Sequence, residues 1–134
     1  MPIYWQSKKQ SSIARSTSEA ELIAMSSALF GEVLQIQDMQ HYLLGGRPDV
    51  HFQQDNQAVI KIVGNQYSVK LRHCGRVHRV NIASVSALMT EEEQQVSLSY
   101  CNTQDQLANP LTKILAPAQW PEALLQLQVR EIAT

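Results

Sequence analysis

The fold is decided by residues 50–65, which read VHFQQDNQAVIKIVGN. Val50 to Asp55 alternates apolar and polar side chains, which predicts a half-buried strand ending at Asp55. Asn56 is a favoured helix N-cap, and the apolar residues after it predict a short helix that ends at Gly64. A strand that leads directly into a helix is typical of α/β proteins.

Upstream of this stretch, the sequence predicts one long helix from about Ser18 to Leu44. Ser18 and Glu21 have the S-x-x-E form of a capping box, and a Gly-Gly-Arg-Pro sequence at 45–48 ends the helix. Apolar residues recur at helical spacing with one gap, at Leu22, Met25, Leu29, Val33, Ile36 and Leu43.

Other segments complete the predicted α/β pattern. Residues 2–6 alternate around Ile3 and Trp5 and predict a short strand, as do residues 96–100. Helices are predicted at about 80–92, 104–115 and 121–132, the last two broken by Pro110 and Pro117. Strands alternating with helices indicate an α/β layer structure, and we expect residues 1–134 to form a single domain.

Composition limits the classes of protein to which the chain can belong. Its 134 residues, 44% of them hydrophobic, suffice for one buried core, and the net charge of -1 restricts nucleic-acid binding to a local patch. Two cysteines cannot make a disulfide framework and fit a reducing compartment. No apolar run could cross a bilayer and no signal peptide is recognisable, so we expect an intracellular protein, cytoplasmic or nuclear, that is neither secreted nor membrane-bound.

Two acidic residues form the most informative pair. Glu21 lies in the first turn of the long predicted helix, and Asp55 follows a strand, where ligands bind in α/β sheets. Two carboxylates that meet there repel each other unless a divalent cation holds them. On spacing alone, the alternative is favoured: Glu21 belongs to a capping box, and Asp55 is a turn residue beside Asn56.

Four sequence blocks change that weighting. WQSKKQ at 5–10 and ARSTSEAELIA at 14–24 resemble W-x-S-K-K-Q and S-S-T-E-A-E-Y-x-A. DNQAVI at 55–60 and QLANPLTK at 106–113 resemble D-N-x-x-A-I and Q-L-A-D-x-L-T-K. In this order and spacing, over roughly residues 3–115, the blocks resemble the ribonuclease H domain of copia-type LTR retrotransposon polyproteins.

The resemblance implies a fold and an activity. The fold would be a ribonuclease H-like mixed sheet flanked by helices, and the activity would be hydrolysis of the RNA strand of RNA/DNA hybrids. Glu21 rather than Glu19 would be the catalytic Glu, Asp55 a strand-end metal ligand, and both would hold Mg²⁺ or Mn²⁺. A shared cation requires the two carboxylates within roughly 8 Å, and we expect them to face Asn109.

The sequence also departs from the family pattern. The family site has four carboxylates, but Asn109 stands at the position of its last Asp, and its first Asp lies on a strand upstream of WQSKKQ. We therefore expect a domain truncated at its N-terminus, without the first two strands of the family fold. Fewer carboxylates weaken the binding of hard cations, so we expect weak or no cleavage by this chain alone. One alternative is that the chain binds no cation.

A non-catalytic role is the alternative function. A basic segment would bind phosphate backbones through Lys70, Arg72, Arg76 and Arg79. Ser16 and Gln57 would make further contacts to a hybrid. A solvated loop is an equal alternative for the basic segment. The missing first strand would leave residues 50–55 with a bare sheet edge. We expect a second copy of the chain, or residues 2–7, to cover it. A remnant with no selected activity is a third possibility.

Zinc-ligand residue types also occur, as His73, Cys74, His78 and Cys101. No C-x₂-C or H-x₃-H spacing supports a zinc site, although the two histidines are five residues apart. We therefore expect Cys74 and Cys101 to be ordinary thiols.

Overall fold

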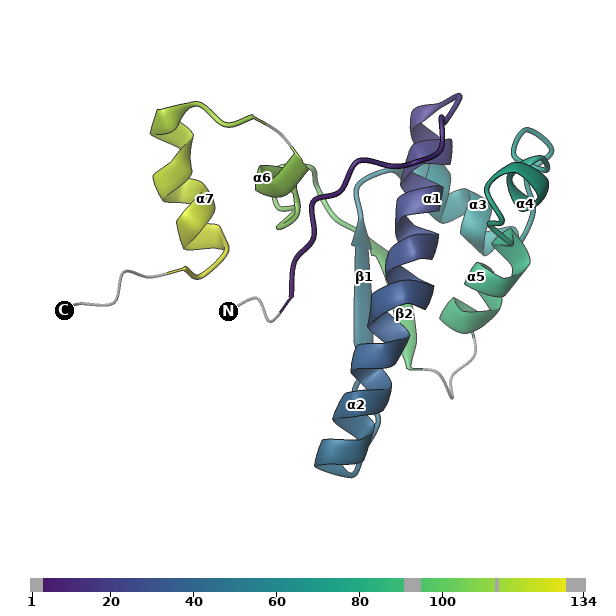
Figure 1. Ribbon diagram of the computed structural model, residues 1–134, viewed down its shortest axis with the longest axis horizontal. Coiled ribbons are helices and arrows are strands. Elements are labelled where there is room, and N and C mark those ends of the chain that lie inside the picture. The colour runs from purple at the N-terminus through teal and green to yellow at the C-terminus, as the bar shows by residue number, and fades with distance from the viewer. Residues whose placement is uncertain (1–3, 91–94, 113, 130–134) are drawn as a thin grey trace. The chain divides into compact units, whose positions relative to one another are not determined.

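A computed structural model of the chain describes residues 4–90, 95–112 and 114–129 (Figure 1). These residues divide into two compact units. One is formed by residues 10–101, and the other by the chain before Gln10 and after Cys101. The protein is mixed α/β and mostly helical, which confirms the predicted class; the expectation of a single domain stays a prediction.

The predicted long helix is present in the unit 10–101 with a wide turn inside it. Helix α1 (Thr17–Ala28) continues through a π-helical turn, η1 (Leu29–Val33), into α2 (Leu34–Leu44). The helix buries apolar side chains before the wide turn but not after it: α1 buries Leu22 and Met25, whereas α2 buries only Gln37. The helix ends at Gly45, whose φ of 74° is the left-handed C-cap conformation that glycine adopts without strain.

The predicted capping box is wrong by two residues. Helix α1 begins at Thr17, and Ser16 is its N-cap, with the Ser16 hydroxyl accepting a hydrogen bond from the Glu19 amide at 3.2 Å. Ser16-x-x-Glu19 has the same S-x-x-E form as Ser18-x-x-Glu21, so the pattern fits two registers. The earlier register places Glu19, not Glu21, at the third helical position.

Two parallel strands form the sheet of this unit. Strand β1 (Val50–Gln54) pairs with β2 (Val96–Tyr100), and the register runs from Val50 opposite Val96 to Gln54 opposite Tyr100. Both strands were predicted. A parallel pair needs a long crossover, and helices α3 (Gln57–Gly64), α4 (Cys74–Val77) and α5 (Ile82–Thr90) lie between the two strands in the chain.

Asparagine side chains cap two of the crossover helices. The Asn56 side chain accepts hydrogen bonds from the amides of Ala58 and Val59, which confirms the predicted start of α3. Asn81 accepts from the two amides at the start of α5, so this helix begins two residues later than predicted. Its predicted residues 91–92 lie outside the described residues.

The core of this unit lies between α1, the crossover and the sheet. Helix α3 contacts α1, α5 and both strands, which makes it the centre of the packing. The buried apolar side chains are Leu22, Met25, Leu29, Val59, Val63, Leu71, Cys74, Val80, Ile82, Val85 and Val96.

The strand predicted at residues 2–6 is wrong over its described part. Tyr4, Trp5 and Gln6 have no regular structure and are exposed, and residues 2–3 lie outside the described part of the chain. A short alternating stretch becomes a strand only where another strand supplies its hydrogen bonds. Among the described residues β1 pairs with β2 alone, so the predicted bare edge of 50–55 is present within them.

The described residues of the second unit form short helices and no strand. Helix α6 (Asn109–Thr112) is a single turn, and a 3₁₀ turn (Pro117–Gln119) precedes α7 (Trp120–Gln126). Among the described residues, the helix predicted at 104–115 is reduced to the single turn of α6. Pro110 has no N–H to donate to residue 106, and proline fits only the first turn of a helix. The helix predicted at 121–132 ends early at Gln126, and its residues 130–132 lie outside the described part of the chain. None of the described helices is long and apolar enough to span a membrane.

Candidate functional site

The most distinctive group in the structure is a buried cluster around Glu19. Within the unit 10–101, the Glu19 side chain is 1% exposed, and three side chains from residues 73–78 approach one of its oxygens. We call Glu19, His73, Cys74 and His78 the Glu19 cluster. It joins the first turn of α1 to a segment more than fifty residues later in the chain.

The contacts within the Glu19 cluster converge on a single atom. The Nε2 atoms of His73 and His78 lie 2.9 and 2.7 Å from Glu19 Oε1, and the Cys74 Sγ lies 3.9 Å from it. The other oxygen, Oε2, accepts a hydrogen bond from the Arg15 amide at 2.9 Å. One carboxylate oxygen is therefore held by the backbone, and the other faces only side chains.

Local structure explains why residues 73–78 turn inward. Cys74 opens α4, and its carbonyl accepts the His78 amide at 2.9 Å, which places these residues one helical turn apart on one face. Arg79 then takes a left-handed φ of 57°, an unusual conformation for a non-glycine residue. This reversal lets His78 face Glu19 while Val80 enters the core.

The electrostatics of the Glu19 cluster favour a charged carboxylate. Burial by itself raises the pKa of Glu19, because a buried charge loses its hydration. Hydrogen bonds from the Arg15 amide, His73 and His78, together with the charge of His73, overcome this and lower the pKa from 4.5 to about 2. Burial and the neighbouring Glu19 raise the pKa of the Cys74 thiol.

The two predicted metal ligands lie elsewhere in the same unit. Glu21 is exposed on α1, and Asp55 is half-buried directly after β1. The first turns of α1 lie at the same end of the unit as the end of β1 that leads into α3 (Figure 1). Asn109 begins α6 in the other unit, where its side-chain amide donates to the Thr103 carbonyl at 3.1 Å. The predicted carboxylate separation and the orientation toward Asn109 stay predictions.

The predicted nucleic-acid contacts differ in their surroundings. Four cationic side chains of the basic segment are exposed: Lys70, Arg72, Arg76 and Arg79. Gln57 is exposed at the first position of α3, whereas the Ser16 hydroxyl caps α1. The structure thus gives Ser16 a role in helix formation, and its role as a contact to a hybrid stays a prediction.

Three members of the Glu19 cluster are zinc-ligand residue types noted in the sequence, but Glu19, which contacts all three, was not predicted to join them. His73, Cys74 and His78 come together, whereas Cys101 is buried outside the cluster. Glu19 precedes the buried Leu22 by three positions, so it lies on the buried stripe of α1. A carboxylate on an apolar stripe is the signal that could have identified it.

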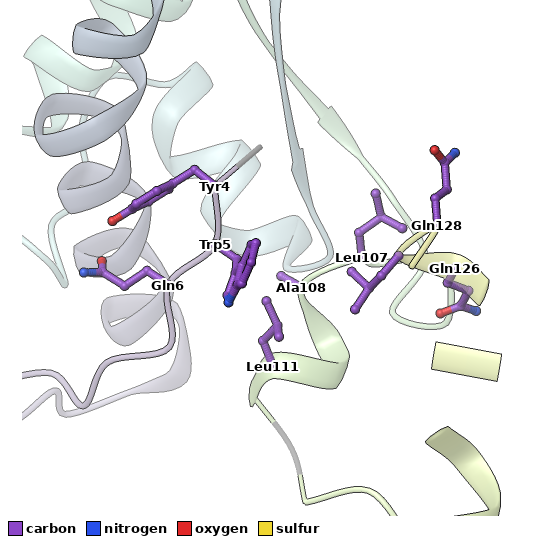
Figure 2. A pocket seen from close by; sticks show the side chains of 9 residues that line it. Tyr4, Trp5, Gln6, Leu107, Ala108, Leu111, Gln126 and Gln128 are labelled. Atoms are coloured by element: carbon purple, nitrogen blue, oxygen red, sulfur yellow. The ribbon is translucent and has the colours of Figure 1, made fainter. Parts of the chain in front are cut away.

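The second unit has an apolar pocket of its own. Figure 2 shows Trp5, Ala108 and Leu111 gathered at one side of it. The Ser7 hydroxyl donates a hydrogen bond to the Leu111 carbonyl at 2.9 Å, which connects the chain around Ser7 to α6. The pocket measures about 430 Å³ and is lined by Tyr4, Trp5, Gln6, Leu107, Ala108, Leu111, Gln126, Leu127 and Gln128. None of these side chains is a carboxylate, imidazole or thiol, so the lining has no group suited to acid–base catalysis at neutral pH.

Comparisons of the chain with protein-family models, with curated proteins and with solved structures found no match. The resemblance to copia-type ribonuclease H domains therefore stays a prediction that rests on the four sequence blocks.

Proposed function

We propose that this chain is a retroelement-derived, ribonuclease H-like domain that binds nucleic acid through its basic segment and hydrolyses RNA/DNA hybrids weakly or not at all. Nucleic-acid binding is proposed from one observation: residues 70–79 have an exposed cationic side and a buried side. Lys70, Arg72, Arg76 and Arg79 are exposed, whereas Cys74 and the His78 side chain are buried against Glu19.

This division supports phosphate binding over a merely solvated loop. The buried side fixes part of the backbone of the segment, and cations on a fixed backbone lose less conformational freedom when they bind. Residues 70–79 contain no acid, so no carboxylate within the segment competes with phosphate for its cations. An RNA/DNA hybrid, with a charged phosphate at every step of both strands, is the partner that the resemblance implies.

The carboxylates support the weak-hydrolysis part of the proposal. Glu21 and Asp55 offer the hard oxygen donors that fit Mg²⁺ or Mn²⁺. When bound, such a cation would supply Lewis acidity to activate water and stabilise the leaving oxygen. Asn109 contributes an amide in place of the family's charged ligand. Lower ligand charge weakens both cation binding and water activation.

Hybrid binding is tested by measuring affinity against salt concentration. Each phosphate contact contributes a slope of about -0.9 in log K against log[salt], so Arg72→Gln/Arg76→Gln should make the slope shallower by about 2. We expect affinity at 0.1 M salt to fall roughly tenfold or more. Lys61→Gln, an exposed cation on α3, is the control and should change little. Equal losses in both variants would contradict binding through the basic segment.

Hydrolysis is tested with the same hybrid, labelled on its RNA strand, in Mg²⁺ and Mn²⁺ titrations. We expect little or no cleavage by the chain, and little gain from Asn109→Asp alone. Adding the two upstream strands of the family fold together with Asn109→Asp should produce cleavage that Asp55→Asn abolishes. Robust cleavage by the unmodified chain, lost in Asp55→Asn, would contradict weak hydrolysis and leave the binding result unaffected.

Self-assembly is a second candidate function, supported by the sheet edge. Among the described residues, β1 pairs on one side only, and an unpaired edge offers backbone donors and acceptors to another strand. Sedimentation of the chain at increasing concentration tests this candidate, and a monomer at every concentration would count against it.

A further inference from the structure

We propose that Glu19, His73, Cys74 and His78 form a structural Zn²⁺ site. The site is distinct from the carboxylates considered for hydrolysis, and it does not depend on the proposed function. Its ligands come from the start of α1 and from the short segment around α4, so a bound ion would crosslink two distant parts of the unit 10–101.

The geometry brings three ligand atoms close enough to share an ion, and His78 contacts one of the three residues. One ligand atom each from Glu19, His73 and Cys74 lie within 4.8 Å of one another, and the His78 Nε2 lies 2.7 Å from Glu19 Oε1. Four ligand atoms are the number that structural zinc sites use. The side chains of Glu19 and His78 are 1% and 3% exposed, so water has little access.

The donor set selects zinc among common cations. A thiolate and two imidazole nitrogens with a carboxylate oxygen are typical ligands of Zn²⁺, whereas Mg²⁺ and Ca²⁺ take oxygen ligands. The i, i+4 relation of Cys74 and His78 places both side chains on one helical face, where each contacts Glu19. Zinc ligands can come from distant parts of a sequence when the fold brings them together. Glu19 is such a ligand, more than fifty residues before His73, so a search for local ligand spacing does not find it.

The hydrogen-bonded arrangement leaves the thiol poorly satisfied. A carboxylate oxygen has two lone-pair positions, and both are taken up at Oε1 by the histidines at 2.7 and 2.9 Å. The Cys74 Sγ is left with a long contact of 3.9 Å to the same atom. A cation bound here would give the Cys74 sulfur, as a thiolate, a bond of its own.

The shell around Glu19 is that of a prepared metal ligand. Metal-binding carboxylates are held by a hydrogen bond to the oxygen that does not bind the ion. The Arg15 amide makes this bond to Glu19 Oε2 at 2.9 Å. The Ser16 cap fixes the helix turn that carries Glu19, and the core side chains of Leu71 and Val80 flank the residues from α4.

The test uses the full chain, treated with a chelator and then titrated with Zn²⁺ and, separately, with Co²⁺ as a spectroscopic probe. We expect one Zn²⁺ per chain and a higher melting temperature when zinc is present. Co²⁺ should give the intense visible bands of tetrahedral coordination and a near-ultraviolet thiolate-to-metal charge-transfer band. Cys74→Ser should remove the charge-transfer band, and His78→Gln should weaken Zn²⁺ binding roughly tenfold or more.

Matched variants separate this site from adventitious binding. Cys101→Ser removes the other buried cysteine, and His41→Gln removes an exposed histidine of α2; both should bind Zn²⁺ and Co²⁺ as the unmodified chain does. Circular dichroism checks that each variant is folded. Absence of stoichiometric binding by the unmodified chain would overturn the proposal, as would a charge-transfer band that survives Cys74→Ser.

Discussion

Replacing Glu19 by alanine is expected to lower the free energy of unfolding of the chelator-treated chain by about 3–5 kcal/mol. This is the usual cost of removing one partner from a buried, hydrogen-bonded charge cluster. The side chains of His73 and His78 would each lose the acceptor of their Nε2 atoms, and the Arg15 amide would lose its partner. The measurement is urea denaturation followed by circular dichroism at pH 7.

Glu21→Ala is the matched control, because it removes the same side chain two residues later on the same helix. Glu21 is exposed, and we expect its loss to change stability by no more than about 0.5 kcal/mol. Similar effects of the two substitutions would mean that the Glu19 cluster contributes nothing to stability. Glu19→Gln, which keeps the size and one acceptor oxygen, should fall between the two.

Acid is expected to destabilise the chain through Glu19. The pKa of Glu19 is about 2 in the folded chain, below its ordinary value of 4.5, so the folded state favours the charged form. The stabilisation, roughly 3 kcal/mol, is present in full above pH 4.5 and is lost as the pH falls toward 2. The midpoint of urea denaturation, measured from pH 7 to pH 2, should therefore fall steeply across this window.

Glu19→Gln isolates the contribution of this one carboxyl among the other acids of the chain. Because glutamine does not titrate, the difference in unfolding free energy between the two proteins should shrink as the pH falls from 4.5 to 2. A difference that stays constant over this range would contradict the lowered pKa of Glu19.

Much of the fold could be predicted because its signals are local. The helix from α1 to α2, strand β1, the Asn56 cap of α3 and strand β2 each follow from periodicity and end signals within a few residues. The strand at 2–6 could not be decided in this way, since a strand exists only with a partner. The helix at 104–115 is present only as the single turn of α6, because Pro110 is compatible only with the first turn of a helix.

The candidate site was less predictable, because burial depends on contacts between distant residues. Nothing near Glu19 in the sequence indicates that His73 and His78 will reach it. The S-x-x-E pattern fitted both Glu19 and Glu21, and the resemblance favoured Glu21. The contacts of residues 73–78 with Glu19 show which of the two acids is buried.

The parallel pairing of β1 and β2 also has a kinetic consequence. Although the chain is mostly helical, residues 50 and 96 must meet before the sheet exists, and Glu19 must meet residues more than fifty positions away. Closing loops of this length costs entropy before any contact forms. The unit 10–101 should therefore fold at the pace of mixed proteins of high contact order, more slowly than a helical bundle of its size.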